Sequence, residues 1–188
     1  MSRRTVRVVT SAVLAVAIAG TSTTALAAPK PVTAVAPRAV SNYACTMLTT
    51  AKAQRFVPNA KLNAASSKAS PTAATCAYTK GGSQSSYVYG VAVAMFGPGI
   101  VKQMTGTVDE KIKKVLAAYN RPLTARKDLG SHVWYSTWKT RAFYPQLMSW
   151  YQNNSIVVVL MIVPVKAKNA VFAVERSIRA HFKTGHLK

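Results

Sequence analysis

The chain has 188 residues and carries 25 lysines and arginines against four aspartates and glutamates, a formal net charge of +21. This length suffices for one domain with a real core but not for two domains of ordinary size. So few carboxylates argue against acidic metal sites, and the sequence has no HExxH, CxxC or glycine-rich phosphate loop. We therefore expect no metal and no cofactor, and a surface that attracts polyanions.

The N-terminus has the three parts of an export signal. Arg3, Arg4 and Arg7 precede an apolar run over 8–20, and Ala25-Leu26-Ala27 has the small residues that signal peptidase recognises. The run is shorter than the roughly 20 residues that a membrane-spanning helix needs. We predict cleavage after Ala27 and a secreted protein. Loss of the three arginines lowers the net charge of +21 to +18.

Four segments are predicted from these features. They are a signal peptide over 1–27, a linker rich in proline and alanine over 28–42, a single α+β domain over 43–184 and a flexible tail over 185–188. The two cysteines, Cys45 and Cys76, are expected to form a disulfide because export leads to an oxidising space. Neither the oligomeric state nor the export route, secretory or twin-arginine, follows from the sequence.

Elements in the first half of the domain are predicted from spacing. Leu48, Ala51 and Phe56 recur at helical intervals, which indicates one helix from 45 to about 57 that Pro58 ends. A mobile loop is expected over 59–75. Strands are predicted over 74–79 and 85–96, since Val91, Val93 and Met95 alternate on one side of the second.

The second half begins with a predicted helix over 107–119, which Thr107 and Glu110 start as a capping box. Further strands are predicted over 124–127, 131–138, 146–152 and 155–163, the last two joined as a hairpin by Asn153-Asn154. The apolar stretch 156–163 indicates a central strand. A final helix is predicted over 166–183, with Val171, Val174, Ile178 and Phe182 inward and Lys168, Arg176 and Arg179 outward. The predicted fold is α+β, a mostly antiparallel sheet packed by two or three helices.

Three short motifs follow one another along the domain: a Cys-x-x-Leu-Thr helix start, a Cys-x-Tyr strand and a Leu-Gly-x-x-x-Trp segment. The residues that carry them are Cys45, Leu48, Thr49, Cys76, Tyr78, Leu129, Gly130 and Trp134. This order resembles a group of actinobacterial secreted and lipid-anchored proteins of unknown function, and is similar to the extracellular sensor domains of mycobacterial kinases. The resemblance implies a Cys45–Cys76 disulfide and a ligand-binding or envelope-associated role. This chain lacks the lipid-attachment cysteine of the anchored members.

Aromatic residues suggest a binding site. His132, Trp134 and Trp138 fall on one face of a predicted strand, and Lys139 and Arg141 follow them as candidate phosphate ligands. The alternative is that these aromatic side chains, with Trp150 and Tyr151, belong to the core. Lys111, Lys113 and Lys114 are expected on a solvated helix face.

His132 is the only histidine on a predicted strand, which makes it a candidate catalytic base. Asp128 lies four residues before His132 and could orient it as a base. The alternative is that His132 is a surface histidine and Asp128 an acid in a loop, with no catalytic role for either. No catalytic residue is therefore assigned.

The leading functional hypothesis is a secreted, non-enzymatic binding protein of the cell envelope. Its partners would be anionic cell-wall polymers or a membrane surface, with nucleic acid bound only nonspecifically. A secreted toxin or ribonuclease is the first alternative, and an extracellular protease inhibitor the second. An exposed cleft around His132 with a second titratable group would favour the ribonuclease.

Overall fold

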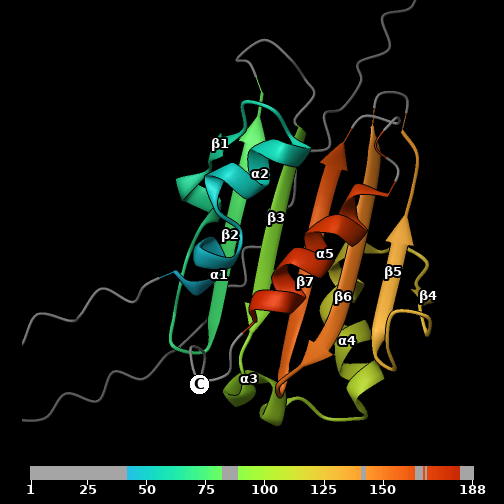
Figure 1. Cartoon of the computed structure of the whole chain (residues 1–188). Coiled ribbons are helices and arrows are strands. Elements are labelled where there is room, and N and C mark those ends of the chain that lie inside the picture. The colour runs from blue at the N-terminus through green and yellow to red at the C-terminus, as the bar shows by residue number, and fades with distance from the viewer. Residues whose placement is uncertain (1–41, 82–88, 141–142, 164–166, 168, 183–188) are drawn as a thin grey trace, which may run out of the picture. The chain divides into compact units, whose positions relative to one another are not determined.

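The computed structural model describes residues 42–81, 89–140, 143–163, 167 and 169–182. Their strands form one antiparallel sheet in the order β1-β2-β3-β7-β6-β5-β4 (Figure 1). The strands are β1 (Lys61–Leu62), β2 (Ala73–Lys80), β3 (Tyr89–Phe96), β4 (Thr124–Ala125), β5 (Val133–Thr137), β6 (Tyr144–Gln152) and β7 (Ser155–Val163). The predicted α+β fold with an antiparallel sheet is confirmed.

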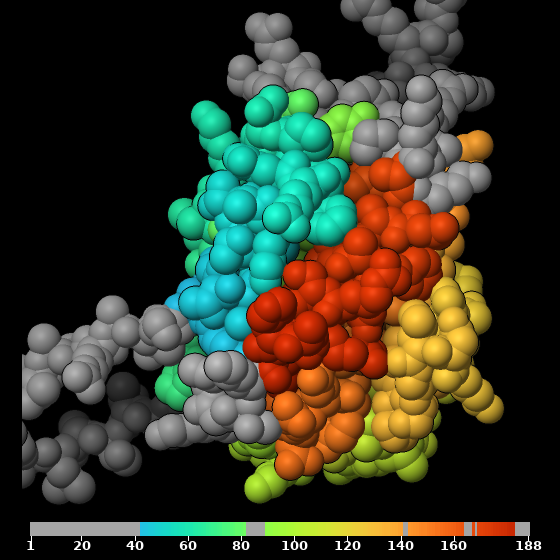
Figure 2. Space-filling model, viewed as in Figure 1, coloured from blue at the N-terminus to red at the C-terminus, as the bar shows by residue number. Residues whose placement is uncertain are grey.

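Helices cover both faces of this sheet. The helices are α1 (Tyr43–Met47), α2 (Thr50–Phe56), α3 (Pro98–Gln103), α4 (Val108–Leu116) and α5 (Ala170–His181), with 3-10 turns η1 (Ala64–Ser66) and η2 (Ala117–Tyr119). In Figure 1, α1, α2 and α5 lie in front of the sheet and α4 lies behind it. Figure 2 shows α1, α2 and α5 side by side over the front face, where they hide most of the strands. No helix in the described ranges is long and apolar enough to span a bilayer.

The central strand is β7, as its sequence predicted. Ile156, Val157, Val158 and Val159 are at most 2% exposed, because side chains on both faces of β7 lie under helices. Asn153 and Asn154 have φ angles of 53° and 59° and join β6 to β7 in a tight hairpin. The predicted hairpin is confirmed, and β6 begins two residues earlier than expected, at Tyr144.

The first predicted helix is two helices. Leu48 ends α1, and the Thr49 side chain caps α2 by accepting a hydrogen bond from Lys52 N at 3.3 Å. Leu48 is 1% exposed, so the break directs this side chain into the core. In a single continuous helix, Thr49 would lie inside the helix and could not act as an N-cap while Leu48 is buried.

The predicted loop 59–75 contains regular structure. It holds β1 and η1, and β2 begins inside it at Ala73. Backbone hydrogen bonds tie the segment to β2: Asn63 N donates to Ala77 O at 2.8 Å, and Thr75 N donates to Lys68 O at 2.7 Å. These polar residues therefore cover the edge of the sheet, which sequence pattern alone did not indicate.

A disulfide joins the first helix to the sheet. Cys45 in α1 and Cys76 in β2 are bonded, with their Cα atoms 5.0 Å apart. Cys76 is fully buried among the core residues. The predicted pairing is confirmed.

The later helices match their predictions in part. Thr107 and Glu110 form the predicted capping box, and α4 buries Ile112 and Leu116. The predicted stripe of Val171, Val174 and Ile178 in α5, with Phe182 directly after the helix, is buried.

The outward face of α5 was predicted partly wrongly. Arg176 is exposed, but Arg179 lies 5.5 Å over the Trp150 ring and donates to Leu129 O at 2.8 Å. A long arginine side chain can cover an aromatic ring while its charged end reaches a carbonyl. Lys168 lies outside the described residues.

Candidate functional site

The candidate site begins with the alternation of side chains along β5. Trp134 pairs with Ser149 of β6, Tyr151 N donates to His132 O, and Trp138 N donates to Pro145 O. Residues 132, 134, 136 and 138 therefore point to one face of the sheet. The opposite face carries Tyr135, whose ring lies 5.2 Å from Phe172 of α5. The face with His132, Trp134 and Trp138 is thus the one that α4 covers.

Asp109, in the first turn of α4, connects this helix to β5. Its Oδ1 atom accepts a hydrogen bond from Trp134 Nε1 at 2.9 Å and lies 3.1 Å from His132 Nδ1. The hydrogen bond from Trp134 lowers the pKa of Asp109, as do the contact with His132 and the charge of Lys113, while partial burial opposes the shift. Asp109 is therefore held as a carboxylate between two ring nitrogens.

A cation stacks on each tryptophan of this face. Lys113 Nζ lies 4.3 Å from the centre of the Trp134 ring, and Arg121 Cζ lies 4.9 Å from the centre of the Trp138 ring. Both cations are exposed and both tryptophans half-buried. We call Lys113, Arg121, Trp134 and Trp138 the indole row. Each indole ring has a cation over one of its faces, so that face presents positive charge to solvent and not bare aromatic surface.

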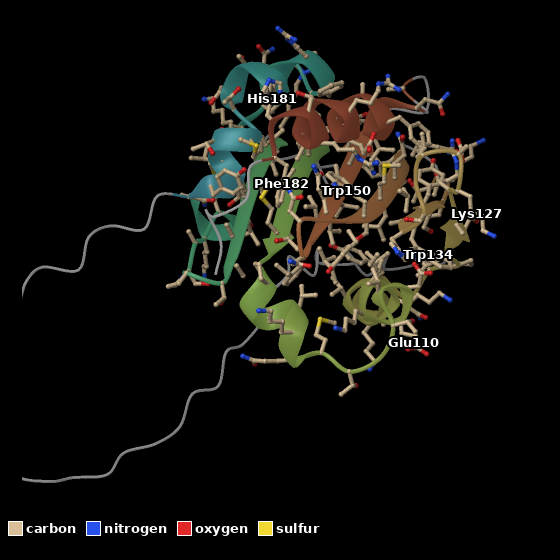
Figure 3. All side chains as sticks on the ribbon, turned by 60° about the horizontal axis from the view of Figure 1, so that its bottom comes forward. Glu110, Lys127, Trp134, Trp150, His181 and Phe182 are labelled. Carbon is tan, nitrogen blue, oxygen red and sulfur yellow. A yellow bond between two sulfur atoms is a disulfide. The ribbon has the colours of Figure 1, made fainter. Side chains whose placement is uncertain are left out.

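The other predicted site residues are not all brought together. Lys139 follows Trp138 and is exposed, whereas Arg141 lies outside the described residues. Trp150 is 1% exposed and belongs to the core, as the alternative reading held. Figure 3 shows Trp150 inside the molecule below α5 and Trp134 at its edge on the α4 side. Tyr151 is half-buried, with its ring 6.1 Å from that of His132.

Asp128 does not pair with His132, which agrees with its interpretation as a loop acid. Asp128 instead accepts two hydrogen bonds from Arg126, at 2.8 Å and 2.6 Å. Arg126 also lies 4.6 Å over the Phe172 ring, which holds its guanidinium on the α5 side of the sheet edge. The carboxylate beside His132 is that of Asp109. The capping-box pattern marked the helix start, but no local signal links Asp109 to a histidine 23 residues later.

The lysines of α4 have three different surroundings. Lys111 Nζ donates to Val101 O at 3.0 Å, and Lys114 Nζ donates to Thr105 O at 2.9 Å. These bonds tie α3 and the segment that follows it to α4. Of the three lysines, only Lys113 belongs to the indole row. They therefore do not form one uniform solvated face.

All four acidic residues of the chain are already engaged. Asp109 has the two ring partners, Glu110 Oε2 accepts from Thr107 N at 2.7 Å, and Asp128 pairs with Arg126. Glu175, only 3% exposed, pairs with Arg179 at 2.5 Å. Of the lysines and arginines in the described ranges, only Arg126 and Arg179 have a carboxylate within ion-pair distance. The remaining lysines and arginines there have no carboxylate within ion-pair distance.

The described residues contain no group of three or more His, Cys, Asp or Glu side chains arranged to hold a metal ion. No family model, curated protein or solved structure matches this chain. The resemblance to actinobacterial secreted proteins and kinase sensor domains therefore stays a prediction. Assignment of a function rests on the chain's own residues.

Proposed function

We propose that this chain is a secreted, non-enzymatic binding protein that associates with anionic polymers of the cell envelope through its cationic surface. One observation carries the proposal: each carboxylate already has hydrogen-bond or ion-pair partners within the protein, while most described lysines and arginines have no carboxylate within ion-pair distance. Unpaired surface cations favour phosphate and carboxylate ligands, because opposite charge steers and holds them.

Export supports the choice of an envelope partner. The basic start, the apolar run and Ala25-Leu26-Ala27 predict a cleaved signal peptide. The Cys45–Cys76 disulfide is compatible with an oxidising location outside the cytoplasm. In that space the abundant polyanions are wall polymers that contain phosphate and the headgroups of anionic lipids.

The test uses protein purified after expression of the full-length chain. Its N-terminus is sequenced, and its binding to isolated cell walls, anionic vesicles and RNA is measured across a salt series. We expect Ala28 as the first residue and wall binding that persists at physiological salt. If binding to all three partners disappears together well below that salt concentration, the charge serves no dedicated partner and the proposal fails.

A second candidate, a secreted ribonuclease, rests on His132 and Asp109. A carboxylate at Nδ1 orients an imidazole and leaves Nε2 for proton transfer, and the His132 side chain is 39% exposed. Such an enzyme also needs a second acid or base at the scissile phosphate. Lys113, a cation on this face, is stacked on Trp134, which ranks this candidate second. RNA integrity in the same samples decides it, since an enzyme would cleave the RNA and His132→Ala would stop the cleavage.

A further inference from the structure

We infer that the indole row is the site at which the protein holds its polymer, and that the polymer is a chain of phosphodiester-linked sugars or polyols. This inference rests on the proposed function, because it names the ligand class and the residues of that same surface. It differs from a general attraction by charge in one respect: a defined pair of cations makes the contacts.

The spacing of the row favours an extended ligand. Trp134 and Trp138 lie four residues apart along extended backbone, with their side chains on the same face of the sheet. Their Cα atoms are therefore separated by about 13 Å. Each carries its own stacked cation, at 4.3 Å and 4.9 Å from the ring centre. Two cations stacked on rings spaced in this way suit an extended polyanion with repeated phosphates better than a single small anion.

The stacked cations are prepared for phosphate. Contact with an aromatic ring restricts the lysine and guanidinium groups, so less conformational freedom is lost when an anion binds. Neither Lys113 nor Arg121 has a carboxylate within ion-pair distance among the described residues. Their positive charge is therefore available for phosphate oxygens.

The acidic residues of α4 determine the direction in which the polymer extends along the site. Asp109 and Glu110 lie in the first turn of α4, so they disfavour extension of a polyanion beyond Lys113 toward the start of that helix. Asp109 already accepts from Trp134 and faces His132, and Glu110 caps its own helix. At the other end, Arg121 and the exposed Lys139 have no described acid beside them. The polymer is thus expected to run from Lys113 past Arg121 toward Lys139.

The same geometry favours a sugar–phosphate chain over RNA. Base recognition on aromatic platforms needs an open ring face on which each base can stack. In the indole row one face of each ring is under a cation, and the rings are half-buried. Half-exposed indole edges beside fixed cations suit a sugar or polyol flanked by phosphates.

The test compares two double variants with equal loss of charge. Lys113→Gln with Arg121→Gln removes the cations of the row, whereas Lys61→Gln with Lys102→Gln removes two exposed cations of β1 and α3. All four positions are exposed, so each variant should fold, and circular dichroism with thermal unfolding verifies this. Binding is measured to purified poly(glycerol phosphate), to walls stripped of phosphate polymer and to poly(U), at several salt concentrations.

We expect the row variant to lose affinity for poly(glycerol phosphate) by about tenfold and to show a shallower salt dependence, while the control variant loses less than about twofold. Stripped walls should bind neither variant nor the unaltered protein. Equal losses in the two variants would overturn the inference and leave the proposed function standing. Tighter binding of poly(U), with the larger loss in the row variant, would also overturn it and identify RNA as the ligand. Absence of any binding by the unaltered protein defeats the proposed function itself.

Discussion

Trp134 Nε1 donates a 2.9 Å hydrogen bond to Asp109 Oδ1, so the first turn of α4 is fastened to β5 of the sheet. The same oxygen lies 3.1 Å from His132 Nδ1. One carboxylate thus holds two side chains of the candidate site in place. A charge-assisted bond of this kind also fixes the ring on which Lys113 stacks.

Loss of this carboxylate should loosen the site. We expect Asp109→Ala to lower the free energy of unfolding by about 1 kcal/mol, because the indole loses its acceptor in a partly exposed setting. Asp109→Asn keeps an acceptor and should cost less. Urea unfolding followed by circular dichroism measures both. Equal stability of all three proteins would contradict the proposed role of the bond.

The bond should also make stability depend on acid. The folded pKa of Asp109 is lowered from 3.8, chiefly by the Trp134 hydrogen bond, so the folded state favours the ionised form. Its stabilising effect is complete above the unfolded value and is lost as the pH falls through the folded one. The stability difference between the unaltered protein and Asp109→Asn should therefore be constant above about pH 4 and shrink below it. Unfolding measured from pH 2 to 6 checks this, and a constant difference throughout would refute it.

Glu175 should respond to pH with the opposite sign. Burial raises its pKa above 4.5, although Arg179 and Arg176 oppose the shift. The folded state then binds more protons than the unfolded state, so this group's contribution becomes less favourable as the pH rises from 4.5 through the folded pKa. Glu175→Gln should remove that decline, and its stability relative to the unaltered protein should improve with rising pH over this range.

Glu110 provides the matched control for this experiment. Its pKa is lowered from 4.5, first by the backbone hydrogen bond from Thr107. Glu110→Gln should therefore lose stability relative to the unaltered protein above that value and approach it in acid. If both glutamine variants shift in the same direction, burial does not govern Glu175.

The disulfide should carry a large share of the stability. Cys45 and Cys76 are separated by 31 positions. Closing a loop of that length stabilises a folded chain by about 3 to 4 kcal/mol in the chain-entropy model. We expect a reducing agent, or the double change Cys45→Ser and Cys76→Ser, to lower the free energy of unfolding by that amount. The double variant serves as the control, because the reducing agent should have no further effect on it.

Local spacing predicted several features correctly because each depends on neighbours in the chain. The Thr107–Glu110 capping box needs two side chains three positions apart, and the Asn153-Asn154 turn needs two residues that tolerate positive φ. The buried stripe of α5 follows from its helical period. The break at Leu48 was not predicted, because the spacing of the apolar residues continues across it and does not reveal that Thr49 caps a second helix.

The sequence by itself determined the charge excess, the predicted export signal, the cysteine pair and the apolar stretch that became the central strand. Only the tertiary structure decided the partners of the site. Asp109 reaches His132 and Trp134 because α4 packs across β5, and Arg121 lies over Trp138 for the same reason. These contacts join residues 17 to 25 positions apart, and a polar contact over such a distance leaves no periodic trace in the chain. The packing of helix on sheet therefore decides which cations stack on indole rings and which carboxylates already have partners.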